Sequence, residues 1–190
     1  MPKTISEELA GFGQSLYKNL VELPDHAAIT DTLDYILGAL HGLVQANQKG
    51  FTNRPKPYVK VYQAYLANYA LTVCVGHPVL DSAWEAGFYF NSAIQRLAAA
   101  FDRLPQMLGA SMTKQVKPNP TTAIQRMKQV NPKECKNWTS VYKEVNAFKH
   151  RPAGRAAGRT VTMEDAVLAF SEMMVLLADS KTQLADRYGH

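Results

Sequence analysis

The chain has 190 residues, 46% of them hydrophobic, with 21 Lys and Arg against 16 Asp and Glu. This length favours one domain, and the apolar content suffices for one continuous core, which excludes global disorder. The net charge of +5 is unevenly spread. Residues 113–159 hold eleven Lys and Arg against two acids, giving +9, so the rest of the chain sums to −4. Such asymmetry indicates a face for nucleic acid or another polyanion, although a solvated basic surface without a partner has the same composition.

The cysteines and the N-terminal residues give expectations about the compartment. Cys74 and Cys135 match neither a CxxC pattern nor a Cys/His ligand spacing, so we expect buried free thiols, with no disulfide framework and no metal. Residues 1–20 carry Glu7 and Glu8 where a signal peptide would need cations. No apolar run approaches the roughly 18 residues that span a bilayer. We therefore expect a cytoplasmic protein without a membrane partner.

The N-terminal part has helical periodicity, and the helices are expected to cover about residues 4–48. Thr4 and Glu7 predict a capping box, and Pro24 ends the helix that follows it. A second helix is predicted from about Ala27 to Asn47.

A third helix is expected after the loop at residues 53–57. It carries tyrosines at the spacing i, i+4, i+7 and i+11, namely Tyr58, Tyr62, Tyr65 and Tyr69. Such a stripe could stack nucleic-acid bases beside cations. It is also typical of a core in which each hydroxyl reaches the rim. A ligand pocket lined by this face and Trp84 is a further alternative.

The longest helix is predicted from about residue 79 to residue 104, with Pro105 as its end. Its inward residues are expected to be Trp84, Phe88, Ile94, Leu97, Phe101 and Leu104. Shorter helices are predicted at about 122–130 and 134–149. Thr162 and Asp165 predict the capped start of a final helix, whose apolar stripe runs to Leu184.

These elements predict one fold class. The chain is expected to be an all-α, up-down bundle of six or seven helices in a single domain over residues 1–190, because the short connections favour antiparallel neighbours. The sequence contains no Gly-rich phosphate loop before a helix, no HExxH and no Gly-x-Ser-x-Gly. We therefore expect neither a cofactor nor a metal.

Chemistry-bearing residues gather at the end of the penultimate predicted core helix. Asn146 and His150 lie one turn apart if that helix reaches residue 150, with Lys149 and Arg151 to either side. The loop that follows carries Arg155 and Arg159. Cations can hold a phosphodiester while an imidazole moves a proton. A basic helix C-terminus that complements the helix dipole has the same appearance.

Two runs carry a resemblance to a known family. Residues 90–97 (Phe-Asn-Ser-Ala-Ile-Gln-Arg-Leu) and 145–151 (Val-Asn-Ala-Phe-Lys-His-Arg), with the amphipathic last helix, resemble HEPN-type helical proteins. The resemblance covers about residues 85–185 and implies a HEPN-like core at about 79–186. It implies a metal-independent ribonuclease or its degenerate relative, in a defence or toxin–antitoxin setting and as a homodimer.

The family motif places an Arg four to six residues before its histidine. His150 matches that histidine, but Lys143, Glu144, Val145 and Asn146 precede it, and none is Arg. The expected catalytic residues are therefore His150, Asn146 and Lys143. The expected nucleic-acid-binding residues are Lys149, Arg151, Arg155 and Arg159. The expected function is RNA binding, and the alternative is a non-catalytic interaction subunit of a larger defence or ribonucleoprotein complex.

Overall fold

The computed structural model describes residues 3–51, 82–109, 120–150 and 161–189, and for residues 82–85, 120–122 and 148–150 it describes the backbone alone. In these ranges the chain is all-helical, with seven helices and no strand, as the periodicity predicts. The helices are α1 (Ile5–Leu20), α2 (Ala27–Gln48), α4 (Ser82–Met107), α5 (Pro120–Val130), α6 (Cys135–His150), α7 (Met163–Asp179) and α8 (Lys181–Tyr188). None of the described helices is both long enough and apolar enough to cross a bilayer.

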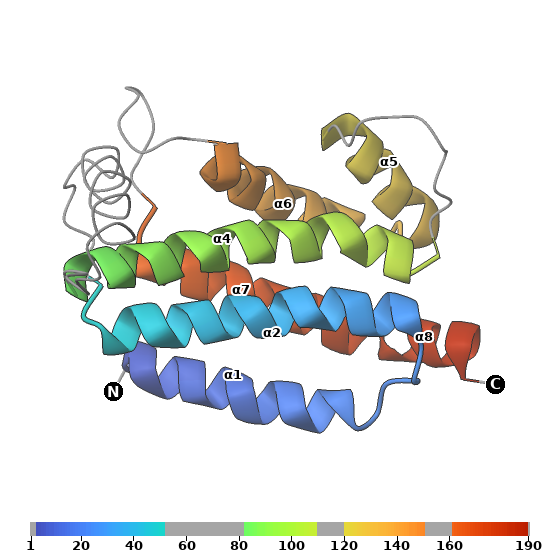
Figure 1. The fold of residues 1–190 in the computed structure, drawn as a ribbon. Helices are drawn as coiled ribbons and strands as arrows, with labels where there is room; N and C mark the ends of the chain where they lie inside the picture. Colours follow the sequence, from blue (N-terminus) through green and yellow to red (C-terminus); the bar gives the residue numbers. More distant parts are fainter. Residues whose placement is uncertain (1–2, 52–81, 110–119, 151–160, 190) are drawn as a thin grey trace, which may run out of the picture.

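The α2–α4 pair forms the middle of the bundle. The two helices run side by side, α1 packs on the far side of α2, and α6 packs on the other side of α4 (Figure 1). Helix α7 contacts α1, α2, α4 and α6. The α2–α4 approach is close because Gly42 has no side chain, and a Cβ there would lie 2.8 Å from the carbonyl oxygen of Tyr89.

One hydrophobic core joins these helices. Phe101, Trp138 and Phe170, from α4, α6 and α7, are fully buried within it. Truncating one such ring to Ala typically costs about 3–5 kcal/mol, so the core fixes how α4, α6 and α7 lie. Cys135 is a buried free thiol, as expected, whereas Cys74 lies outside the described residues.

The helix starts follow the predicted capping chemistry. The backbone N–H of Glu7 donates to Thr4 Oγ1 at 3.3 Å, and the Thr4 N–H donates to Glu7 Oε2 at 2.7 Å. Thr162 and Asp165 make the same reciprocal bonds at 3.1 and 3.0 Å. These bonds satisfy N–H groups that have no partner inside the helix. The predicted capping box at Thr4 and the predicted cap at Thr162 are both confirmed.

Three expectations about the helices are wrong. Helix α4 continues through Pro105 to Met107. The last predicted helix is divided at Ser180, whose hydroxyl donates to the Leu176 carbonyl oxygen at 2.6 Å and so competes with the regular ladder. Phe88 is 51% exposed rather than inward, while the side chain of Trp84 lies outside the described residues.

Candidate functional site

Helix α6 carries the sequence-predicted site and remains helical to His150. Asn146 and His150 are therefore one turn apart on the same side of the helix. The side chain of Asn146 is half-buried and that of Lys143 is exposed. The side chains of Lys149 and His150 lie outside the described residues, so their predicted roles stay predictions.

The outer side of α6 carries two exposed lysines. Lys136 and Lys143 are both exposed, and they lie seven residues, or about two turns, apart. His150 follows after another seven residues, so the backbone of α6 places the three positions along one stripe. We call Lys136, Lys143 and His150 the α6 stripe. The two described lysines of the stripe are available to an anionic partner.

The opposite side of α6 anchors it to its neighbours. Trp138 and Tyr142 are buried and stack with their ring centroids 4.5 Å apart. The Tyr142 hydroxyl donates to Asp102 Oδ1 on α4 at 2.7 Å, and Asn137 Nδ2 donates to Glu172 Oε2 on α7 at 3.1 Å. These contacts fix the rotation of α6 about its axis. Lys136 and Lys143 consequently face away from the core.

Burial has electrostatic consequences in this anchor. Removing the Tyr142 phenol from water raises its pKa above the ordinary value of 10.0, and the hydrogen bond to the Asp102 carboxylate and the charge of that carboxylate raise it further. The phenol therefore remains a hydrogen-bond donor at neutral pH. Among the described residues, the indole Nε1 of Trp138 is the one buried side-chain nitrogen or oxygen without a hydrogen-bond partner.

Helix α5 extends the basic region. Lys128 is exposed and Arg126 is half-buried. Between α5 and α6, the Glu134 N–H donates to Asn131 Oδ1 at 3.2 Å, and Lys133 pairs with Glu134 at 3.9 Å. The hydrogen bond to Asn131 stabilises a local turn just before the first residue of α6. Helices α5 and α6 therefore belong to one basic segment of the chain.

The remaining sequence-predicted residues are not placed. Arg151, Arg155 and Arg159 lie outside the described residues, as does the tyrosine stripe of Tyr58, Tyr62, Tyr65 and Tyr69. Among the side chains that are described, no three of His, Cys, Asp or Glu lie close enough to hold a metal ion together.

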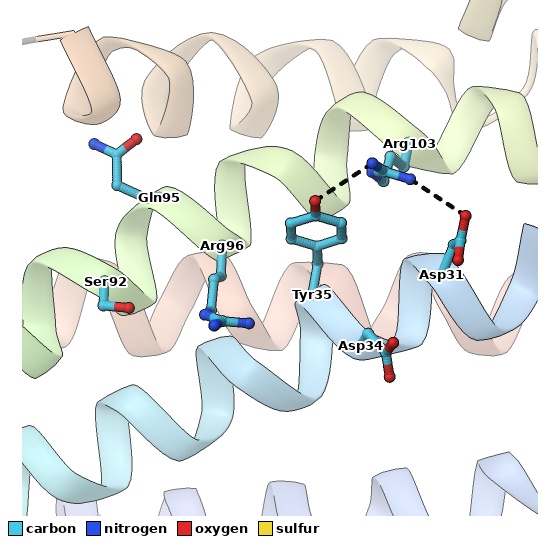
Figure 2. A pocket seen from close by; sticks show the side chains of 7 residues that line it. All are labelled: Asp31, Asp34, Tyr35, Ser92, Gln95, Arg96 and Arg103. Carbon is cyan, nitrogen blue, oxygen red and sulfur yellow. Dashed lines mark hydrogen bonds and ion pairs between the residues drawn. The ribbon is translucent and has the colours of Figure 1, made fainter.

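Sequence reasoning missed a polar groove between α2 and α4. Its volume is about 580 Å³, and its lining residues are Asp31, Asp34, Tyr35, Ser92, Gln95, Arg96 and Arg103 (Figure 2). The spacings of Asp31 with Tyr35 and of Arg96 with Arg103 would have placed each pair on one helix face. No local pattern says that those two faces meet, so the groove was not predictable from spacing alone.

Comparisons with known proteins find no matching family model, curated protein or solved structure.

Proposed function

We propose that this chain binds RNA through the basic surface of α5 and α6. The observation that carries the proposal is the exposed pair Lys136 and Lys143 on the α6 stripe, within a segment that has nine more cations than acids. Polyanion affinity comes largely from cations that neutralise phosphates and release counterions. The resemblance to HEPN-type proteins supports RNA rather than another polyanion as the partner.

The fold supports this assignment through the way α6 is held. Trp138 and Tyr142 fix the helix against the core, and this leaves Lys136 and Lys143 on the outside. Cations on a rigid helix keep their spacing without the ordering cost that a flexible loop would bring. The α6 stripe is thus a preorganised track for a phosphate backbone.

Charge reversal on the α6 stripe tests the proposal. The double variant Lys136→Glu/Lys143→Glu should weaken binding of a fluorescent single-stranded RNA by at least about tenfold at about 50 mM salt, because the contacts become repulsive. The matched control is Lys3→Glu/Lys18→Glu, which makes the same change in net charge at exposed positions outside the basic segment. If the two double variants bind equally well, or if the native protein shows no salt-sensitive RNA binding, the proposal is wrong.

The proposed role is binding without catalysis, because no Arg stands four to six residues before His150. In a metal-independent cleavage the 2′-oxygen would attack the adjacent phosphorus while His150 takes its proton, and the bond from phosphorus to the 5′-oxygen would break. The 5′-oxygen would leave with a proton from water, and the other product would be a 2′,3′-cyclic phosphate. We expect labelled RNA to stay intact with the native protein in EDTA. Cleavage that His150→Ala reduces by about 10²–10⁴ would identify a ribonuclease and contradict the non-catalytic role.

A further inference from the structure

The α2–α4 groove is lined by charged side chains of both signs. Arg96 and Arg103 come from α4, while Asp31 and Asp34 come from α2, and Tyr35 stands between the two arginines (Figure 2). The four formal charges sum to zero, so the groove does not attract a polyanion by charge alone. A volume of about 580 Å³ lies within the roughly 300–1,000 Å³ of small-molecule sites.

In one half of the groove the charged side chains already contact one another. Arg103 Nη2 donates to the Tyr35 hydroxyl at 3.3 Å, and Arg103 Nη1 pairs with Asp31 Oδ2 at 3.7 Å. The Arg103 guanidinium carbon also lies 4.5 Å from the Tyr35 ring centroid. Asp31 therefore balances the charge of Arg103. The guanidinium and the ring form a cation–π pair.

The other half of the groove holds two charged groups that are exposed and unpaired. Neither Arg96 nor Asp34 makes an ion pair or a hydrogen bond with another described side chain, and Gly38 lets the Arg96 side chain lie across α2. A Cβ at Gly38 would collide with the Arg96 guanidinium. This half of the groove thus offers a guanidinium, which lies over Gly38 of α2, and the Asp34 carboxylate one turn away on the same helix.

We propose that the groove binds one guanine nucleotide, with its phosphate on Arg96 and its base on Asp34. A guanidinium is a planar donor that fits phosphate oxygens, whereas a carboxylate only accepts hydrogen bonds. Guanine alone among the RNA bases presents two neighbouring N–H donors on its Watson–Crick edge, and two carboxylate oxygens match them. Uracil presents one N–H between two carbonyls, which the Asp34 carboxylate would repel.

Titration with free mononucleotides tests the groove directly. GMP should bind more tightly than UMP by roughly ten- to hundredfold, as a bidentate base contact does elsewhere. Asp34→Asn should remove most of this preference, because the amide replaces an acceptor by a donor. The control Asp179→Asn changes an exposed carboxylate of α7 and should leave both affinities unchanged. Equal affinities of the native protein for GMP and UMP, or an unaltered preference in Asp34→Asn, would overturn the proposal.

Gly38→Ala separates binding from folding. The new Cβ would displace the Arg96 side chain, which can move because its guanidinium is the far end of a flexible chain. Alanine favours a helix interior over glycine by about 1 kcal/mol, so the melting temperature should hold or rise. Affinity for GMP should nevertheless fall by about tenfold, as in Arg96→Ala, because a charge-assisted phosphate contact is lost. Unchanged GMP affinity in both variants would show that Arg96 does not hold the phosphate.

The nucleotide could be free or part of an RNA strand, and only the second source rests on the proposed function. A U-only RNA and the same RNA with one G distinguish the sources. If the G raises RNA affinity in the native protein but not in Asp34→Asn, the groove reads a base of bound RNA. If GMP binds while neither RNA does, the groove takes a free nucleotide and the RNA-binding proposal fails alone. If RNA binds while GMP does not, the groove proposal fails alone.

Discussion

At the scale of single residues, the hydrogen bond from Tyr142 to Asp102 helps to hold α6 against α4. Tyr142→Phe keeps the stacking on Trp138 and removes only the hydroxyl. A hydrogen bond to a charged group contributes about 1.5–3 kcal/mol, so we expect the free energy of unfolding in urea to fall by about that amount. Tyr17→Phe is the matched control, because Tyr17 is 73% exposed and should change stability by less than about 0.5 kcal/mol. Equal stabilities of the two variants would mean that the Tyr142 bond does not hold α6.

The same phenol predicts a pH dependence. Its pKa is raised in the folded protein above the ordinary value of 10.0, chiefly by burial. A raised pKa means that the stabilisation is complete below pH 10.0 and is lost as the pH rises toward the folded-state pKa, because only the unfolded chain ionises in that interval. Urea unfolding should show a smaller loss of stability above pH 10.0 in Tyr142→Phe than in the native chain. A loss of the same size in both proteins would mean that Tyr142 is not the group whose ionisation destabilises the fold.

At the scale of elements, helix caps give the next prediction. The Thr162 hydroxyl accepts a hydrogen bond from the Asp165 N–H at the start of α7. Helix α7 contacts more of the described helices than any other helix does. Thr162→Ala should lower the free energy of unfolding by about 0.5–2 kcal/mol, as measured by urea denaturation. Thr182→Ala in α8 replaces an exposed threonine that caps nothing, and it should leave stability nearly unchanged. A Thr162→Ala protein as stable as the native one would show that the cap contributes little.

Helix α8 also forms hydrogen bonds with the ends of α4 and α5, although the sequence indicated only a continuation of α7. Gln183 Nε2 donates to the carbonyl oxygens of Val130 at 3.0 Å and Leu108 at 3.4 Å, and the Tyr188 hydroxyl donates to Met107 O at 2.9 Å. These acceptors lie at the C-terminal ends of α4 and α5, where carbonyls lack partners within their own helix. Gln183→Ala should therefore lower the free energy of unfolding in urea by about 1–3 kcal/mol, because it removes two part-buried hydrogen bonds of about 0.5–1.5 kcal/mol each. Unchanged stability would mean that water replaces the amide.

The helices were predictable because each one carries its own apolar period and several carry their own caps. The features that the sequence did not predict depend on tertiary packing. Helix α4 continues past Pro105 because Leu104, Met107 and Leu108 around it are buried. The free energy gained from this core packing outweighs the one backbone hydrogen bond that proline cannot donate. The position of His150 at the end of α6 followed from local periodicity. The α2–α4 groove did not, because its walls come from helices that only the long-range fold brings together.

At the scale of the whole molecule, charge separates along the fold. Residues 1–51 carry three Lys and no Arg against six acids, and α1 lies on the far side of the α2–α4 pair from the basic α5 and α6 (Figure 1). A polyanion should therefore approach from the α6 side, since the potential of the surface adds over many groups. The salt dependence of RNA affinity distinguishes direct contacts between lysines and phosphates from the summed electrostatic potential of the surface.

The slope of RNA affinity against salt makes that distinction. Each phosphate neutralised on a single strand contributes about −0.7 to the slope of log Kobs against log salt, so Lys136→Ala/Lys143→Ala should make the slope shallower by about 1.4. Lys3→Ala/Lys18→Ala removes the same net charge from exposed positions of the acidic N-terminal segment and should leave the slope unaltered. Fluorescence anisotropy between about 50 and 200 mM salt measures both slopes. If the two double variants shift affinity and slope alike, RNA senses only the net charge, and the α6 stripe has no contact of its own with the phosphates.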